Sequence, residues 1–525
     1  MTFISVGEWL ERRAQLSPDR VALVDVATGQ RLTYRELNTR ARALAALLAV
    51  GADGVRPGVR QGDRVAILAA NCPEYLDALF ACALLGVILV PLNWRLTVPE
   101  LCGILGDCEP ALLLHDTAHR ATAMAASGLI GGLPGVHRTP LLALEDFPGA
   151  DNALAARAVP FCTDDGEEIA LILYTSGTTG VPKGAMLSHR MLTWNAVNTQ
   201  VSWGLRETDV YPNCSPFFHA GGLNVLTTPI YHLGGTVVLL RDASPGAVLD
   251  AIARERCTLV FAVPAVFQML LEHPAFAATD FSSVRFCITG GSSCPPLIIE
   301  AFARRGVEFR QGYGLTEVGV NCFSLAPEDA LRKVGSVGRP VFHSRARIVD
   351  DEGRDVAPGA VGELVLAGPH VCSGYWRRPE ATAEAFRGGW WHTGDLVSRD
   401  DEGYYYIAGR KKDMYISGGE NVYPAEVEGV LASHPGIAEV AVLGMPDATW
   451  GEVGLAVVVP RTPGVLTEQE VIAFCDGKLA RYKIPRRVVF CVALPRNAMG
   501  KVIKAELAAR YVESLDAGDP GSASH

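Results

Sequence analysis

The sequence has no cysteine pattern that would indicate a zinc site or a disulfide framework. Its 13 cysteines are scattered, and they form no Cys-x-x-Cys pair and no Cys/His spacing typical of zinc. An odd number of scattered cysteines in a long chain is typical of reduced thiols, which persist in the cytoplasm. We therefore expect a cytoplasmic protein without a cysteine-bound metal.

Long apolar runs are also absent. The longest one, residues 78–90, is shorter than the about 20 residues that cross a bilayer, so we expect a buried helix there. The first fifteen residues lack the basic stretch and apolar core of a secretory signal peptide. We expect no transmembrane segment.

Positive charge is in deficit. The chain has 47 Lys and Arg against 57 Asp and Glu, which gives a formal net charge of −10. Binding to nucleic acid needs Lys and Arg clustered against the phosphates, so we expect no nucleic-acid partner. A small anionic ligand is compatible with this charge, because a local site can be positive on an acidic protein.

The chain does contain enough apolar material for large cores. It has 525 residues, of which 49% are hydrophobic and 20% are charged, a composition that excludes wholesale disorder. This length predicts roughly two to four structural units. The 54 glycines exceed the usual share of about 7%, and glycine is used where backbone turns sharply or approaches a ligand.

Short apolar runs alternate with helical patterns between residues 20 and 340, which predicts an α/β fold with parallel, doubly wound sheets covered by helices. The expected buried strands are residues 64–68, 236–240, 259–263 and 285–289. Expected helices between the later strands are residues 245–256 and 296–305.

Residues 345–409 have a different pattern. Two strand–turn–strand patterns, each with Asp-Asp-Glu-Gly at the turn, predict a small antiparallel β unit at residues 347–353 and 396–406. Charged residues 410–413 follow, so we place a domain boundary near Lys412. Beyond it the expected elements are helices at 424–433 and 467–480 and strands at 439–443 and 455–459.

The sharpest motif is YTSGTTGVPKG at residues 174–184. Three glycines, four hydroxyl side chains and one lysine make a phosphate cradle from backbone N–H groups, hydroxyl donors and a cation. The motif follows an expected strand at residues 169–173, and we expect it to lead into a helix capped by Ser188. It is not a Walker A loop, because Pro182 precedes the lysine and Gly184 follows it.

This loop resembles the signature loop of the adenylate-forming superfamily, which includes acyl-CoA synthetases, adenylation domains of peptide synthetases and beetle luciferase. Other motifs match the family in the same order, across almost the whole chain: GYGLTE at 312–317, GEL at 362–364, TGD at 393–395, GR at 409–410 and GK at 500–501. The chain is most similar to a stand-alone acyl-CoA or aryl-CoA ligase.

The resemblance implies a division into domains and a reaction. Residues 1–410 would form a large N-terminal adenylation domain, which includes the β-rich subdomain at 345–409. Residues 411–412 would form a hinge, with Lys412 as its pivot, and residues 413–525 a small mobile α+β domain. ATP would activate a carboxylic acid as acyl-AMP, and the thiol of CoA would then accept the acyl group.

Four residues are expected to act in adenylation. Thr316 and Glu317 would contact the phosphates and Mg²⁺, with Glu317 as the metal ligand, because Mg²⁺ keeps most of its waters and needs few carboxylates. Lys183 and Lys501 would supply positive charge. Attack of the acid on the α-phosphate builds negative charge, which a positioned cation stabilises.

Nucleotide recognition is expected from an aromatic ring and an acidic residue. Tyr313 would stack on the adenine, and Asp395 would accept the ribose hydroxyls beside Arg410. The complete expected ATP- and AMP-binding set is Thr175, Ser176, Gly177, Thr178, Thr179, Gly180, Gly291, Ser292, Gly312, Tyr313, Gly314, Thr316, Asp395, Arg410 and Lys501.

The resemblance also implies where the thiol and the acid would bind. Gly418 and Gly419 would let the pantetheine arm of CoA approach the backbone. The expected acyl pocket is lined by Trp194, His219, Gly222, Gly290, Gly312, Gly319 and Asn321.

The segments around these pocket residues contain no Lys or Arg, which disfavours a second carboxylate in the substrate. Amino-acid-activating relatives have Asp at the position of His219, so an α-amino acid is not expected. Because Trp194 is bulky, we expect an aryl, cinnamic-type or medium-chain acid.

Two alternatives follow from the sequence. The acyl-AMP could pass to a carrier-protein thiol, an amine or another small nucleophile instead of CoA. The chain could also be a nucleotide-binding scaffold without turnover, but binding alone would not require Lys501. We expect a monomer or a homodimer whose partners are the acid, ATP and CoA.

Overall fold

The structure is a computed structural model, and it describes residues 3–52, 56–132, 139–158, 163, 165–175, 182–292, 294–447, 449–497 and 501–512. Its internal contacts divide the chain into two units. Unit 1 comprises Met1–Arg347, Val365–His392 and Gly403–Tyr405. Unit 2 comprises Ile348–Leu364, Thr393–Glu402 and Tyr406–His525. The expected hinge at residues 411–412 concerns a motion and stays a prediction.

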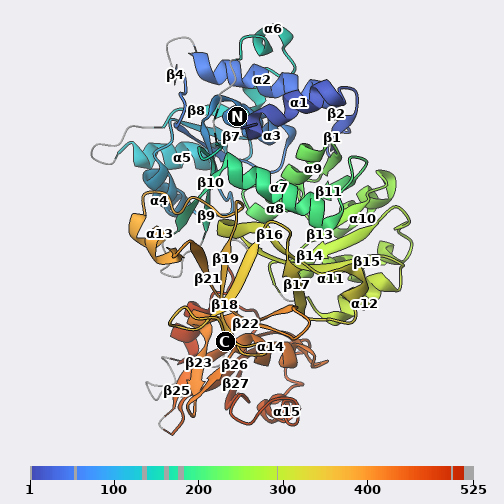
Figure 1. Cartoon of the computed structure of the whole chain (residues 1–525), viewed down its shortest axis with the longest axis vertical. Helices are drawn as coiled ribbons and strands as arrows, with labels where there is room; N and C mark the ends of the chain where they lie inside the picture. The colour runs from blue at the N-terminus through green and yellow to red at the C-terminus, as the bar shows by residue number, and fades with distance from the viewer. Residues whose placement is uncertain are drawn as a thin grey trace. The chain divides into compact units, whose positions relative to one another are not determined.

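A six-stranded sheet forms one part of unit 1 (Figure 1). Its order is β10 (Lys183–Ser188), β9 (Ile169–Thr175), β6 (Ile88–Pro91), β5 (Arg64–Leu68), β7 (Leu112–His115) and β8 (Leu141–Ala143). All neighbours are parallel except β10, which runs antiparallel to β9. The expected strand at 64–68 is therefore confirmed as the inner strand β5.

Helices α4 (Val98–Cys108) and α5 (Arg120–Ile130) pack on this sheet. They do so because their apolar residues recur every three or four positions and so form one stripe. Leu101, Ile104 and Leu105 of α4 join Ala66 and other buried residues of the sheet in one apolar cluster. Alternation of strand and covering helix produces the parallel arrangement that the sequence predicts.

The sequence predicts one buried helix over the apolar run at residues 78–90, but the structure has a helix followed by a strand there. Helix α3 (Pro73–Leu85) ends at its C-cap residue, Gly86, which adopts a left-handed φ of 64°. The chain then enters β6 within three residues. Apolarity alone does not separate a buried helix from a buried strand, and glycine decides the boundary here.

A second sheet of unit 1 has the order β11 (Val210–Asn213), β12 (Thr236–Leu239), β1 (Val21–Asp25) and β2 (Arg31–Thr33). A third sheet begins with the parallel strands β13 (Leu259–Ala262), β14 (Phe286–Thr289) and β15 (Glu308–Leu315). It continues antiparallel through β16 (Gly319–Ser324) and β17 (Ser336–Pro340).

Helices α10 (Pro245–Arg254), α11 (Pro264–Glu272) and α12 (Pro296–Ala303) contribute apolar residues to one core cluster with β13, β14 and β15. These strands and helices confirm the expected elements at 236–305 to within two residues at each end. The remaining helices of unit 1 are α1 (Trp9–Leu16), α2 (Tyr34–Val50), α6 (Asn152–Ala155), α7 (His189–Trp203), α8 (Ala220–Asn224), α9 (Thr227–Leu233) and α13 (Pro379–Ala385).

The β-rich stretch contributes strands whose residues belong partly to unit 1 and partly to unit 2: β18 (Arg345–Val349), β19 (Gly362–Ala367), β21 (Trp390–Arg399) and β22 (Tyr405–Arg410). The first Asp-Asp-Glu-Gly segment turns as expected, with Gly353 at a φ of 78°. The strand expected after this turn is reduced to a single bridge between Val349 and Asp355. The second expected hairpin is present as β21 and β22.

Unit 2 also contains a sheet in the order β24 (Glu420–Val422), β23 (Tyr415–Ser417), β26 (Gly451–Pro460) and β25 (Ile437–Asp447), with β27 (Arg487–Phe490) beside β26. Helix α14 (Pro424–Ala432) matches its prediction. Helix α15 (Glu468–Phe474) is shorter than the expected 467–480, since Gly477 adopts a left-handed φ of 71°. A short helix α16 (Lys504–Leu507) lies near the end.

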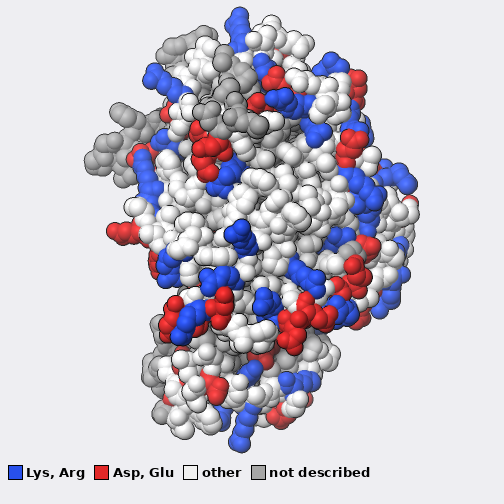
Figure 2. Space-filling model, in the orientation of Figure 1, with Lys and Arg blue, Asp and Glu red and all other residues white. Residues whose placement is uncertain are grey.

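The twelve cysteines that the structure describes are unpaired, and ten of them are buried. Within the described part of the chain, no helix combines the length and apolar composition that a membrane span requires. On the face drawn in Figure 2, coloured Lys and Arg side chains are interspersed with Asp and Glu.

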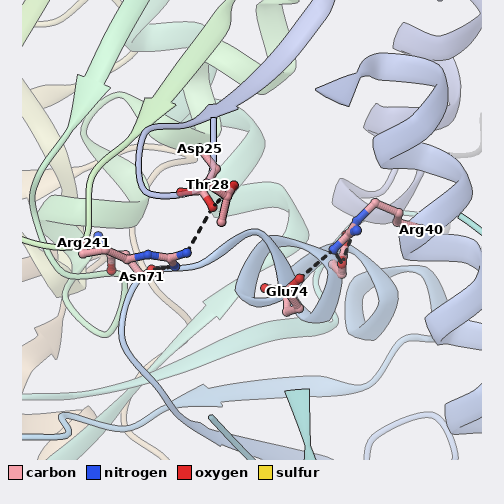
Figure 3. A network of polar contacts seen from close by, with 7 residues as sticks. Asp25, Thr28, Arg40, Asn71, Glu74 and Arg241 are labelled. Carbon is pink, nitrogen blue, oxygen red and sulfur yellow. Dashed lines mark hydrogen bonds and ion pairs between the residues drawn. The ribbon is translucent and has the colours of Figure 1, made fainter. Parts of the chain in front are cut away.

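A buried ion pair joins α2 to α3 (Figure 3). Arg40 on α2 donates from Nη2 to Asp77 Oδ2 on α3 at 2.6 Å, and from Nε to both oxygens of the same carboxylate at 3.0 and 3.1 Å. It also donates to Glu74 at 3.1 Å. The Arg40 side chain is 10% exposed and that of Asp77 only 2%. Removing one partner would leave an uncompensated buried charge.

A second network in Figure 3 ties three segments together. Asp25, at the end of β1, accepts from Thr28 at 2.8 Å and from Arg241 at 3.0 Å. The same guanidinium donates to the backbone carbonyl of Asn71, just before α3. The first network therefore joins two helices, and the second joins the end of β1 to the segments before α3 and after β12.

We predict that Arg40→Ala destabilises the folded protein by about 3–5 kcal/mol, the usual cost of breaking a buried ion pair from one side. Urea unfolding followed by circular dichroism measures this as a lower midpoint. The matched control is Arg35→Ala, since Arg35 pairs with Asp19 at 3.1 Å while both side chains are mostly exposed. We expect a loss of about 0–1 kcal/mol there. Equal midpoints for the two variants would contradict a structural role for Arg40.

Candidate functional site

The expected phosphate-binding motif lies in a β-hairpin. Strand β9 pairs antiparallel with β10, and this register sets Thr175 directly opposite Lys183. The loop between them contains the expected residues Ser176, Gly177, Thr178, Thr179 and Gly180, which lie outside the described residues. The hairpin therefore presents a hydroxyl and a lysine at the two ends of that loop.

A strand, β10, separates the loop of this motif from the helix that the sequence predicts after it. Strand β10 comes first, because its backbone is taken up by pairing with β9. Helix α7 begins only at His189, and there the predicted cap is confirmed: the Ser188 hydroxyl accepts from Met191 N at 3.2 Å. Gly184 belongs to the strand, where a Cβ would lie 2.6 Å from Ile172 Cγ2.

The second motif, residues 312–317, forms the end of β15 and the turn into β16. Gly314 is required by a close approach of strands, since a Cβ there would lie 2.3 Å from the Val320 carbonyl carbon. Tyr313 packs edge-on against Phe323, with 5.6 Å between ring centroids. Thr316 and Glu317 lie in the short 3-10 helix Thr316–Val318. All residues from 312 to 317 are half-buried.

The Glu317 carboxylate joins these two motifs. Its Oε1 accepts from the Thr175 hydroxyl at 3.3 Å and from the Tyr375 hydroxyl at 3.1 Å. The Glu317 carbonyl also accepts from Cys372 N at 2.8 Å, which fixes the backbone beneath the carboxylate. Three residues expected at the site from sequence, Thr175, Lys183 and Glu317, are thus brought together from two distant segments.

Tyr375 is a member of this cluster that the sequence analysis missed. The Lys183 ammonium lies 5.3 Å from the centroid of the Tyr375 ring, a distance typical of a cation–π contact. Burial raises the pKa of Tyr375 well above that of a free phenol, and the Glu317 carboxylate raises it further. The hydroxyl therefore stays protonated at neutral pH and donates to Glu317.

The cluster suits a magnesium ion that is held mainly by phosphates. Among the described residues, no group of three or more His, Cys, Asp or Glu side chains could enclose a metal. A single half-buried carboxylate with a nearby hydroxyl and ammonium fits Mg²⁺, which keeps several waters and binds through one or two carboxylates plus substrate phosphates. Glu317 would hold the ion, and the ion would offset phosphate charge.

In unit 2, Asp395 and Arg410 form an ion pair. Asp395 on β21 is buried, and its Oδ1 lies 3.0 Å from Arg410 Nε at the end of β22. Gly394 before it has a φ of 71°, and its N–H donates to Glu363 at 3.2 Å. The hairpin therefore holds a carboxylate and a guanidinium together, and their expected contact with the ribose stays a prediction.

The expected hinge residue Lys412 and the expected acceptor-loop residues Gly418 and Gly419 lie just after this hairpin. Lys412 is exposed in the short 3-10 helix Lys411–Asp413, while Lys411 pairs with Asp351 at 2.7 Å. Gly418 and Gly419 make the two-residue turn between β23 and β24, both with positive φ. A Cβ on Gly418 would lie 2.5 Å from the Trp450 ring.

Lys501 also lies in unit 2, where its backbone is paired with Asn497. Its N–H donates to Asn497 Oδ1 at 2.9 Å, and its carbonyl accepts from Asn497 N at 2.8 Å. An isolated β-bridge joins the neighbouring residues Arg496 and Val502. The preceding Gly500 lies outside the described residues.

The structure places the expected acyl-pocket residues in unit 1, in several environments. Trp194 on α7 packs edge-on against His343 at 4.7 Å. His219 caps α8 by accepting from Gly221 N at 2.9 Å. The glycines meet closely packed atoms: a Cβ on Gly290 would lie 3.4 Å from the Gly312 carbonyl, one on Gly319 3.2 Å from Asn195, and one on Gly222 2.1 Å from the Pro216 carbonyl.

Asn321 is fully enclosed, and its amide donates to Thr199 Oγ1 at 2.6 Å and to the Val225 carbonyl at 2.9 Å. Two residues expected to contact the nucleotide, Gly291 and Ser292, are exposed after β14, and Gly291 has a φ of 85°.

Comparison with known proteins gives matches over most of the chain. The family described as AMP-binding enzyme matches residues 10–376, and the AMP-binding enzyme C-terminal domain matches residues 426–501. A feruloyl-CoA synthase of an Amycolatopsis species is 43% identical over 507 residues, covering 96% of this chain and 99% of that protein. An indoleacetate–CoA ligase of Aromatoleum aromaticum is 42% identical over 511 residues, covering 96% and 98%.

A solved structure agrees with these relatives. The o-succinylbenzoate CoA synthetase of Bacillus subtilis, in complex with its acyl-adenylate intermediate, superposes with a TM-score of 0.83 at 34% identity, covering 95% of this chain and 97% of that one. The fold, the ordered motifs and these matches agree. The chain belongs to the AMP-binding enzyme family, the adenylate-forming enzymes that include the acyl- and aryl-CoA ligases.

Proposed function

We propose that this chain is an AMP-forming acid–CoA ligase that uses ATP and Mg²⁺. The observation that carries the proposal is the meeting of Thr175, Lys183 and Glu317 at one point, in a chain 43% identical to a feruloyl-CoA synthase. A hydroxyl, a cation and a single carboxylate are the groups needed to hold a triphosphate with its magnesium ion.

In the first half-reaction, a carboxylate oxygen of the acid attacks the α-phosphorus of ATP, and pyrophosphate leaves with the electron pair of the broken P–O bond. Lys183 would neutralise the phosphates, and Glu317 would hold Mg²⁺, which offsets phosphate charge when bound. Lys501 would stabilise the negative charge that develops on the α-phosphate. Tyr313 would pack on adenine, while Asp395 would accept the ribose hydroxyls.

In the second half-reaction, the CoA thiolate attacks the acyl carbonyl carbon, and AMP leaves as the C–O bond breaks. Gly418 and Gly419 would provide backbone without side chains along the pantetheine arm. Holding acid, ATP and thiol in one site removes much of the entropic barrier to their reaction.

The division into domains belongs to this proposal. We place the large adenylation domain at residues 1–410 and the small C-terminal domain at 413–525, with rotation about Lys412 between the half-reactions. The exposure of Lys412 at a short 3-10 helix supports this position, because backbone torsions there can change without disturbing a packed core.

The acid is proposed to be aromatic, of the aryl or cinnamic type, with a medium-chain acid as the alternative. Trp194 and His343 set two rings at the predicted pocket wall, and the segments that line the predicted pocket carry no Lys or Arg to pair with a second carboxylate. The feruloyl- and indoleacetate-activating relatives favour the same class. We place the reaction in the cytoplasm, where unpaired cysteines persist.

The first test is an acid panel, assayed with and without CoA. Cinnamic, ferulic, indoleacetic, octanoic and palmitic acids would be compared by pyrophosphate release and by AMP release. We expect pyrophosphate exchange with the aromatic acids in the absence of CoA, and sustained AMP release only with CoA.

Turnover confined to palmitic acid would overturn the aromatic assignment. Sustained AMP release that requires an amine or a carrier-protein thiol in place of CoA would establish the alternative acceptor.

The second test separates the two half-reactions. Lys501→Ala is expected to slow acid-dependent pyrophosphate exchange by about 10²–10³, the usual effect of removing one group that stabilises transition-state charge. Thioester formation from supplied acyl-AMP and CoA should stay near the wild-type rate. The control is Lys478→Ala, which removes an exposed lysine of the same unit. Equal losses in both half-reactions would refute the role given to Lys501.

A further inference from the structure

We infer that Tyr375 is a positioning residue that sets both the metal-binding carboxylate and the phosphate-binding cation of the site. Its hydroxyl donates to Glu317 at 3.1 Å, and its ring lies 5.3 Å from the Lys183 ammonium. One side chain therefore contacts the two groups of opposite charge that the triphosphate and its magnesium ion require. The inference rests on the proposed function.

The backbone of Tyr375 is held by β10 itself. Tyr375 bridges Ala185, while Met186 N donates to the Gly374 carbonyl at 2.9 Å and Trp376 N donates to the Gly184 carbonyl at 2.8 Å. The segment around Tyr375 thus lies along the edge of the same hairpin that carries Lys183. A shift of the hairpin would move the tyrosine with the lysine.

The conformation before Tyr375 is specified by a glycine. Gly374 has a φ of 115°, and a Cβ there would lie 2.4 Å from Thr382 Cγ2. The Thr382 hydroxyl then accepts from Tyr375 N at 2.9 Å. The ring packs against Trp391 at 5.5 Å between centroids. Backbone and ring are therefore both fixed before any ligand binds.

The hydrogen bonds constrain which oxygen of Glu317 is engaged. Both donors, Thr175 and Tyr375, contact Oε1, and none of the described residues hydrogen-bonds Oε2. Two donors on one oxygen orient the carboxylate plane. Partners that orient a metal-binding carboxylate commonly change metal affinity by about 10–100-fold when they are removed.

The test measures ATP binding by calorimetry at fixed Mg²⁺, without acid, so that no turnover is needed. Tyr375→Phe keeps the ring and removes the hydroxyl. We expect it to weaken Mg²⁺-dependent ATP binding roughly tenfold, with an unchanged unfolding midpoint. In a Glu317→Gln background the same change should have no further effect, because the hydroxyl acts through that carboxylate.

Tyr404→Phe is the matched control. The Tyr404 hydroxyl also donates to a carboxylate, that of Asp329, and its ring also lies under a lysine, with Lys333 Nζ at 5.0 Å. It belongs to none of the motifs expected to bind ATP. We expect its ATP binding to equal that of the wild type. A similar loss in both Phe variants would show a general effect of removing a buried hydroxyl and would overturn the inference.

A second variant tests the contact with the lysine. Tyr375→Leu removes hydroxyl and ring together, and we expect it to weaken ATP binding beyond Tyr375→Phe, since Lys183 loses its aromatic support. Unchanged ATP binding in Tyr375→Phe, or an equal loss with and without the Glu317 carboxylate, would overturn the positioning role. Failure of every acid in the turnover panel would refute the proposed ligase activity and leave this binding comparison interpretable.

Discussion

The antiparallel pairing of β9 with β10 is the constraint on which the described part of the site depends. It sets Thr175 opposite Lys183, and it gives the segment around Tyr375 an edge to lie against. Glu317 then reaches the same point from the turn after β15, more than 130 residues away in the chain. The parallel strands behind β9 supply the rigid, apolar support that a group of charged and polar side chains needs to keep one geometry.

Much of the fold could be predicted from sequence because its signals are local. The buried strands at 236–240, 259–263 and 285–289 are apolar runs of sheet length bounded by turns, and the structure contains each of them. The error occurs where a partner distant in sequence decides the outcome. The apolar run at residues 78–90 is expected as one helix, but after Gly86 it becomes β6, which pairs with β5 and with β9 about 80 residues further along the chain.

The residues of the candidate site that could be predicted from sequence stand in motifs that combine glycine with a charged side chain. Residues that join the site only through contacts with distant segments could not be predicted in this way. Glu317 and Asp395 stand in such motifs, and the structure gives each a specific polar partner. Tyr375 stands in no such pattern, since a single tyrosine after glycine is common, and its partners are 58 and 192 residues distant. Asn321 shows the opposite case. The sequence predicts it as a residue of the acyl pocket, but its side-chain amide donates to Thr199 and to the Val225 carbonyl.

The buried cysteines have a consequence for the chemistry proposed here. Acyl-adenylates and thioesters acylate thiolates, and the reactive form of cysteine is the thiolate. Burial raises the pKa of Cys82, Cys214 and Cys294 to about 12, so these side chains remain thiols at neutral pH. These buried thiols are thereby protected from acylation by the intermediate, so the thiol of the incoming substrate meets little competition from them.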